Sequence, residues 1–195
     1  MPDRASRRLF LAAAASAGVA SWPAAADTAE LTIGSARGTI DFAIGDSKIF
    51  RATGSFRDWE GKVTVDDGDI PNSSVHVVVH TDSLDMLDEQ QTTMLKDADF
   101  FDVGRFPAMI YRSTAVARTG EMTLHVEGVL TLRGITRPMA LQASVTNRVP
   151  DARPGRRYAT FRAEGSLKRS EYGMTRYVDV VGDTVDINIR TDAWR

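Results

Sequence analysis

The chain has 195 residues, of which 24 are Lys or Arg and 26 are Asp or Glu, so its formal net charge at pH 7 is −2. A weakly acidic chain without a basic block is not attracted electrostatically to nucleic acid or to an anionic membrane surface, which excludes both as charge-driven partners. The sequence contains no cysteine, which excludes disulfides, thiolate nucleophiles and metal sites with cysteine ligands.

The N-terminal segment has the features of an export signal. Residues 6–11 (SRRLFL) contain paired arginines, an apolar stretch covers residues 9–20, and residues 24–26 (AAA) offer a small-residue cleavage site. An uncleaved membrane anchor is the alternative, but the apolar stretch is rich in alanine and shorter than the roughly 20 residues that span a bilayer. We therefore expect residues 1–26 to be a twin-arginine signal peptide for export to the periplasm, and residues 27–195 to form one domain.

Apolar and polar residues alternate along most of this domain, which is the pattern of β-strands with one buried face. The alternation covers residues 39–44, 75–80, 122–133, 139–145, 161–167 and 185–190. Glycine- and proline-containing turn signals separate these segments at the spacing of hairpins. The pattern predicts an all-β fold, a single antiparallel β-barrel of about eight strands. Such a barrel is either filled by side chains or holds one small ligand, and the alternation leaves open which face of each strand points inward.

The β pattern is interrupted between residues 86 and 101, where apolar residues recur near helical spacing. Asp85, Asp88 and Glu89 stand at the start of this interval, and acidic residues are favourable at a helix N-terminus. We predict a short helix there, lying across one end of the barrel because strands precede and follow it.

An aromatic cluster of Phe100, Phe101 and Phe106 stands at the end of this interval and just after it. The cluster either plugs the barrel as part of its core or lines a ligand cavity, and the sequence leaves both interpretations open. Adjacent residues of an extended segment point to opposite sides, so we expect Phe101 to pack in the core and Phe100 to act as a lid.

Residues suited to catalysis or metal binding are few. His76 and His80 would stand about 13 Å apart on one face of a strand, at ~3.3 Å per residue, which is too far to share a metal ion. Asp97, Asp99 and Asp102 have a spacing that suits helix termination and exposed turns. The sequence has no GxSxG elbow, GxGxxG loop or GxxxxGK[ST] loop. We therefore expect a protein that is not an enzyme, with no metal site and no cofactor.

Several motifs together resemble the YceI-like family. Residues 99–107 (DFFDVGRFP) and residues 128–138 (GVLTLRGITRP) carry the resemblance, with GSF at residues 54–56, DSL at residues 82–84 and KRSEYG at residues 168–173. It covers nearly the whole chain beyond the expected signal peptide. The resemblance implies a lipocalin-like antiparallel β-barrel in the periplasm, which encloses a long isoprenoid-type lipid and has no known catalytic activity.

The candidate ligand contacts are apolar and aromatic residues of this barrel, and the lipid itself is implied by the resemblance, not by the alternation. Tyr111, Arg112 and Tyr172 are the candidates for contact with a lipid head group. The candidate ligand-binding residues are Phe42, Ile44, Phe56, Trp59, Val77, Val79, Leu95, Phe100, Phe101, Phe106, Met109, Tyr111, Leu124, Leu130, Leu132, Phe161 and Tyr172.

Three functions are compatible with these observations. The one we favour is a periplasmic binding or carrier protein, a monomer or homodimer, that holds a polyisoprenoid or an isoprenoid quinone inside the barrel. The alternative is a non-catalytic accessory protein whose filled barrel docks a membrane-protein partner, for instance in a respiratory system. The third is an enzyme acting on a hydrophobic substrate, but the sequence shows no group of residues arranged for catalysis.

The export signal makes a direct prediction. Changing Arg7 and Arg8 together to Lys should leave the full-length precursor in the cytoplasm, because lysine lacks the planar guanidinium group of the paired arginines. Cell fractionation followed by immunoblotting measures the distribution of precursor and mature protein. Mature protein in the periplasm at the wild-type level would show that export uses another signal.

Overall fold

The computed structural model of the protein describes residues 28–45, 51–149 and 152–195. The expected signal peptide lies outside the described residues. The described chain forms one antiparallel sheet with two short α-helices. None of the helices in these three ranges is long and apolar enough to cross a bilayer.

Eight long strands build the sheet, and each of the first three bends so that it divides into two segments. The divided strands are β1 (Thr28–Gly34) with β2 (Gly38–Ile44), β3 (Ala52–Phe56) with β4 (Trp59–Asp66), and β5 (Ser74–His80) with β6 (Leu84–Asp85). The undivided strands are β7 (Ala108–Arg118), β8 (Thr123–Leu132), β9 (Ile135–Thr146), β10 (Arg157–Lys168) and β11 (Thr184–Trp194). Single 3₁₀ turns form two of the bends, η1 (Ser35–Arg37) and η3 (Thr81–Ser83).

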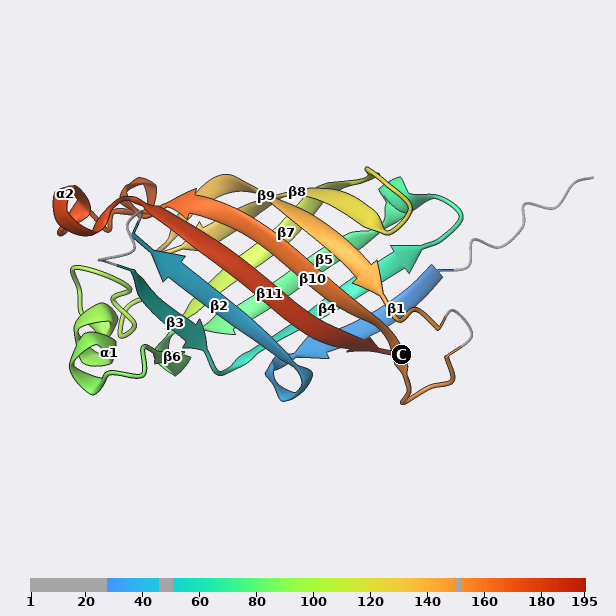
Figure 1. Ribbon diagram of the computed structural model, residues 1–195, viewed down its shortest axis with the longest axis horizontal. Helices are drawn as coiled ribbons and strands as arrows, with labels where there is room; N and C mark the ends of the chain where they lie inside the picture. Colours follow the sequence, from blue (N-terminus) through green and yellow to red (C-terminus); the bar gives the residue numbers. More distant parts are fainter. Residues whose placement is uncertain (1–27, 46–50, 150–151) are drawn as a thin grey trace, which may run out of the picture.

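The sheet closes on itself to form a barrel (Figure 1). Its strands pair in the order β1-β4-β5-β7-β8-β9-β10-β11, and β11 then pairs with both segments of the first strand. Thr32 of β1 stands opposite Trp194 of β11, and β2 continues the same seam along β11. The predicted all-β fold with an antiparallel barrel of about eight strands is confirmed.

Most strands present one parity of their side chains to the interior, and β7 and β10 change parity where their register shifts. On β5, Val75, Val77 and Val79 face the interior, whereas His76 and His80 belong to the opposite face. Apolar residues therefore line the inside of the barrel, and the two histidines lie on its outer surface. The structure thus decides the facing of the strands, which the alternation had left open.

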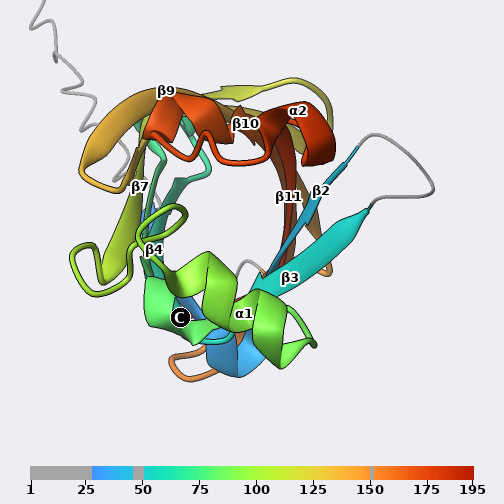
Figure 2. The same cartoon turned by 90° about the vertical axis from the view of Figure 1, so that its left-hand side faces the viewer.

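The two ends of the barrel differ in construction (Figures 1 and 2). At the helical end lie α1 (Glu89–Lys96), the 3₁₀ turn η4 (Arg169–Tyr172) and α2 (Val178–Val181). The other end we call the mouth. It contains the turn from β4 to β5 with η2 (Ile70–Asn72), the turn from β7 to β8, the C-terminal end of β9 and the N-terminal end of β10. The two ends of the barrel are therefore unlike.

The expected short helix is α1. Its N-terminus is capped by Asp88, whose carboxylate accepts a hydrogen bond of 2.8 Å from the backbone N–H of Gln91. Glu89 occupies the first turn and Lys96 the last, which matches the helix dipole at both ends. As expected, α1 covers part of one barrel end (Figure 2).

The chain after α1 is a compact turn and not an extended segment. The N–H of Phe101 bonds the carbonyl oxygen of Leu95 at 2.9 Å, and the N–H of Phe100 bonds that of Asp97 at 3.0 Å. Phe100 is 7% exposed and Phe101 is half-buried, and both rings line the interior. The prediction that Phe101 packs in the core and Phe100 acts as a lid assumed an extended backbone, which would send the two rings to opposite sides. That assumption is wrong, because the backbone forms a turn here.

Gly128 on β8 makes room for the ring of Tyr111 on β7. A Cβ atom added at Gly128 would lie 2.5 Å from both Cζ and the hydroxyl oxygen of Tyr111, and 2.6 Å from the carbonyl oxygen of Arg112. The last of these atoms belongs to the backbone of the paired strand, so it cannot move aside without disturbing the sheet. Glycine is therefore required here for close packing of the wall.

Gly128→Ala should lower the free energy of unfolding by roughly 1–3 kcal/mol, because the added methyl group overpacks the wall. Thermal unfolding followed by circular dichroism measures the loss. Gly104→Ala is the matched control, since a Cβ at Gly104 would meet no atom within 4 Å, and its melting temperature should stay near that of the wild type. A wild-type melting temperature for Gly128→Ala would contradict the packing described here.

Candidate functional site

The barrel is hollow. Its interior contains a cavity of about 540 Å³, lined by side chains from the strands and from the α1 and α2 regions, most of them hydrocarbon or aromatic. This volume lies within the ~300–1,000 Å³ range of ligand-binding cavities in proteins. The alternative of a barrel filled by its own side chains is therefore not what the structure shows.

Aromatic rings gather toward the helical end of the cavity. The ring centroids of Phe42 and Phe56 are 5.6 Å apart, and Phe101 meets Phe56 edge to face, also at 5.6 Å. Phe100 lies 6.5 Å from the ring of Tyr177, which comes from the loop before α2. The aromatic cluster after α1 therefore lines the cavity at its helical end, and it does not fill the barrel as a plug.

Most of the candidate ligand contacts from the sequence come together around this cavity. The lining includes Phe42, Ile44, Phe56, Trp59, Val77, Val79, Leu95, Phe100, Phe101, Met109, Tyr111, Leu124, Leu130, Leu132 and Phe161. Their position in the wall is a property of the structure, and their contact with a ligand stays a prediction.

Two candidates, Phe106 and Tyr172, do not line the cavity. Phe106 lies beneath the turn from β8 to β9, where a Cβ added at Gly134 would be 3.1 Å from its Cε1 atom. Its carbonyl oxygen accepts a hydrogen bond of 2.6 Å from the hydroxyl of Thr81. Tyr172 is 1% exposed and packs in the core at η4. Both residues are thus placed at turns of the helical end, outside the cavity lining.

The expected head-group contacts also change. Tyr111 lines the cavity, but its hydroxyl lies 3.3 Å from the carbonyl oxygens of Val126 and Met139 and can donate to either, so it is directed at the wall. Arg112, the next residue on β7, is exposed on the outer face of the barrel. Arg112 is therefore excluded as a contact for a ligand inside the barrel.

A buried arginine, Arg169, organises the helical end. It is 5% exposed, and its guanidinium group donates to the carbonyl oxygens of Gly182 at 3.0 Å, Met174 at 3.1 Å and Arg176 at 2.7 Å. Burial lowers the pKa of Arg169, while the nearby Asp183 carboxylate opposes that shift. Arg169 thus holds the loop around α2 in place, and it also lines the cavity. The sequence motif KRSEYG contains this residue, but nothing in the motif indicated its role.

A second contact joins the two parts of the helical end. Arg176, in the loop before α2, forms an ion pair with Asp99, in the turn after α1. With the Phe100 and Tyr177 rings, this ion pair connects segments that are 77 residues apart in the chain. The two segments at the helical end are therefore joined to each other.

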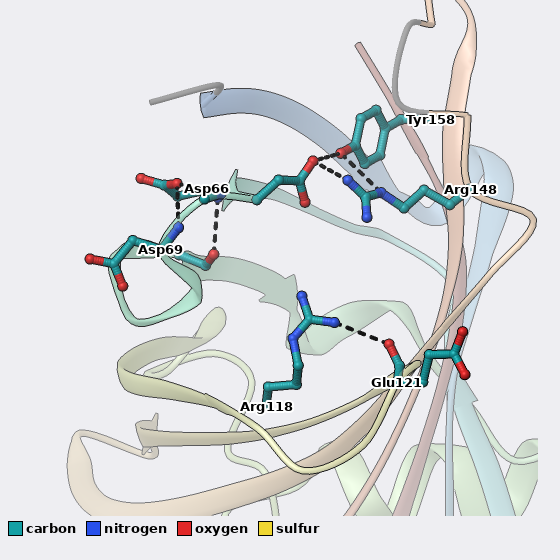
Figure 3. A network of polar contacts seen from close by, with 9 residues as sticks. Asp66, Asp69, Arg118, Glu121, Arg148 and Tyr158 are labelled. Carbon is teal, nitrogen blue, oxygen red and sulfur yellow. Dashed lines mark hydrogen bonds and ion pairs between the residues drawn. The ribbon is translucent and has the colours of Figure 1, made fainter. Parts of the chain in front are cut away.

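The mouth contains a network of polar groups that the sequence did not reveal (Figure 3). The guanidinium group of Arg148 forms an ion pair with the Asp67 carboxylate, and its Nε donates to the Tyr158 hydroxyl at 3.4 Å. Tyr158 in turn donates to the same Asp67 oxygen at 2.9 Å. Burial raises the pKa of Tyr158, which keeps its hydroxyl protonated and able to donate. All three residues line the cavity.

The turn that carries Asp67 is held rigidly by its neighbour Asp66. Asp66 is buried, with 3% of the residue exposed. Its carboxylate accepts hydrogen bonds from the backbone N–H groups of Gly68 at 3.1 Å and Asp69 at 2.8 Å. Such a side-chain bond to the following backbone is typical of turn-forming aspartates. Asp66 is therefore a structural residue that positions Asp67 over the mouth.

On the far side of the mouth, Arg118 at the end of β7 donates to the backbone carbonyl oxygen of Glu121 at 3.1 Å (Figure 3). Both residues line the cavity and both are exposed. Nowhere in the described ranges do three or more His, Asp or Glu side chains gather in a way that could hold a metal ion. In the described chain, the charged side chains that line the cavity thus lie at its two ends, where the arginines form hydrogen bonds and an ion pair.

Comparison with known proteins identifies relatives of this chain. A model of the YceI-like domain matches residues 31–193. A UPF0312 protein of Enterobacter sp. (strain 638) is 32% identical over 139 residues, which cover 71% of each chain. Protein YceI of Salmonella arizonae is 31% identical over 139 residues, covering 71% of this chain and 72% of the relative.

Solved structures share the fold. BcnA of Burkholderia cenocepacia superposes with a TM-score of 0.70 at 21% identity, covering 83% of this chain and 98% of that one. The YceI protein of Campylobacter jejuni gives 0.68 at 19% identity, covering 78% and 90%. A polyisoprenoid-binding domain from Saccharophagus degradans, implicated in plant cell wall breakdown, gives 0.62 at 12% identity, covering 85% and 97%. At these identities the superpositions establish the barrel fold alone.

The buried hydroxyl of Tyr111 predicts a pH dependence of stability. Burial raises the pKa of Tyr111 to about 12, whereas a tyrosine in the unfolded chain ionises near pH ~10. Above that pH the unfolded chain loses a proton that the folded protein retains, so stability should fall as the pH rises from about 10 to 12. Tyr111→Phe should show a shallower fall of melting temperature over this window, each protein being compared with its own value at pH 7. Equal slopes would contradict the burial of this hydroxyl.

Proposed function

The chain belongs to the YceI-like domain family, and we propose that it is a periplasmic binding or carrier protein for a long isoprenoid-type lipid. The observation that carries the proposal is the hollow, apolar interior of a closed barrel, with aromatic rings toward one end and polar groups at the other. Its twin-arginine motif supports the periplasmic location. The polyisoprenoid-binding domain of Saccharophagus degradans supports the class of ligand.

The lining suits a flexible hydrocarbon tail. Transfer of a tail from water to this interior gains roughly 0.8 kcal/mol per CH₂ group, offset by the entropy lost when a flexible chain is ordered. Six methionines line the cavity, and their unbranched, polarisable side chains adapt to irregular shapes such as a methyl-branched tail. They are Met86, Met94, Met109, Met122, Met139 and Met174.

The proposed role is binding without chemical conversion. The arginines that line the cavity are engaged with other side chains or with backbone carbonyl groups, as Arg148 is with Asp67 and Arg169 is with three carbonyl oxygens. Nucleophilic catalysis needs a nucleophile held by a general base beside the reacting group. The family relationship likewise favours a binding protein over an enzyme.

Purified protein incubated with an isoprenoid quinone such as menaquinone-4 should form a stoichiometric complex from which the lipid is recovered unchanged. Native mass spectrometry measures the complex, and chromatography of the extracted lipid measures its integrity. Absence of binding to any isoprenoid lipid, or the appearance of a converted lipid, would contradict the proposal.

A pair of substitutions on β9 tests whether the lipid lies inside the barrel. Ala143 lines the cavity, whereas Ala140 is exposed on the outer face of the same strand. Ala143→Phe should reduce lipid affinity at least tenfold, because the ring occupies space needed by the tail, and Ala140→Phe should bind as the wild type does. Equal binding by both variants would place the lipid elsewhere. Circular dichroism checks that each variant is folded.

A further inference from the structure

The charges at the mouth determine which head group the proposed lipid can carry. A long isoprenoid lipid ends either in a neutral group, such as a quinone or an alcohol, or in a phosphate ester. These ends differ in charge, because a phosphate monoester carries about −1.5 to −2 at neutral pH. Only unpaired cations would compensate such a charge in a partly buried site.

The arginines that line the cavity are already engaged. Arg148 is paired with Asp67 in a half-buried contact, with 32% and 27% of the two side chains exposed. Arg118 donates to the neutral carbonyl group of Glu121, and the two arginines of this rim, Arg118 and Arg148, are balanced in formal charge by the carboxylates of Asp67 and Glu121. Arg169, at the helical end, donates to three carbonyl groups and lies near Asp183.

Two carboxylates of this rim oppose an anionic head group directly. Asp67 and Glu121 both line the cavity beside Arg118 and Arg148, so a phosphate entering the mouth would meet a rim with no net formal charge and would compete with Asp67 for Arg148. A neutral acceptor meets no such penalty. The contacts with Asp67 and Tyr158 use two of the five N–H donors that a guanidinium group carries, and the others can serve a carbonyl or hydroxyl oxygen.

We propose that the mouth, through Arg148, Asp67 and Tyr158, is the head-group site and that it selects a neutral isoprenoid lipid over a polyprenyl phosphate or diphosphate. The tail then extends toward the aromatic rings of the helical end. This inference rests on the proposed function, and it adds the position and the charge of the head group.

The test compares two lipids with the same tail, geranylgeraniol and geranylgeranyl diphosphate, binding to the full-length wild-type protein at low ionic strength. The alcohol should bind at least tenfold more tightly. Raising the salt concentration should narrow the difference, because exposed charges are screened over about 8 Å at physiological ionic strength. Diphosphate binding as tight as or tighter than that of the alcohol would overturn the inference and leave the proposed function standing. Failure of both lipids to bind would overturn the proposed function itself.

A matched pair of substitutions in one turn tests the position. Asp67→Asn removes the carboxylate charge that is paired with Arg148 and should shift the preference at least tenfold toward the diphosphate. Asp69→Asn removes the same charge two residues away, at an exposed residue outside the cavity lining, and should leave the preference unchanged. A preference for the alcohol that survives Asp67→Asn, or an equal shift in both variants, would overturn the placement of the head group at this network.

Discussion

Closure of the sheet is the constraint on which the cavity depends. An open sheet would leave the backbone groups of its first and last strands without partners. Here β11 pairs with β10 on one side and with β1 and β2 on the other, so the ring of hydrogen bonds is complete. Arg37 reinforces the seam by stacking on Trp194, with 3.4 Å between the guanidinium carbon and the ring centroid. Apart from β6, which pairs with β3 alone, each strand segment of the described wall is bonded to a neighbour on both sides.

The closed wall also explains why the two ends carry different chemistry. At the helical end, Arg169 and the ion pair between Asp99 and Arg176 hold loops beside the aromatic rings, and most of the cavity lining there is apolar. At the mouth, short turns bring charged groups to the rim, and the Asp67 carboxylate neutralises Arg148. An amphipathic ligand in such a barrel has one favourable direction, tail toward the rings and head toward the mouth.

Local patterns in the sequence predicted the parts of this protein that depend on local geometry. Alternation of apolar and polar residues has the period of a strand, so the all-β fold and the number of strands followed from it. The start of α1 could be predicted for the same reason, because the capping side chain of Asp88 bonds to a backbone N–H group only three residues away. The resemblance of the motifs indicated the family. Most of the apolar candidates lie around the cavity, because alternate residues of a strand face the same side of the sheet.

The tertiary structure alone decided what depends on contacts across the barrel. Asp67 and Arg148 are 81 residues apart, and only the order and register of the strands bring them to one rim. The facing of Arg112, the turn that sends both Phe100 and Phe101 inward, and the distance of Phe106 from the cavity likewise follow from the path of the chain in space. The sequence determined that a barrel with an apolar face would form, because periodicity is a local property. That the barrel is hollow, and that its mouth is polar, was decided by how residues remote in the sequence meet.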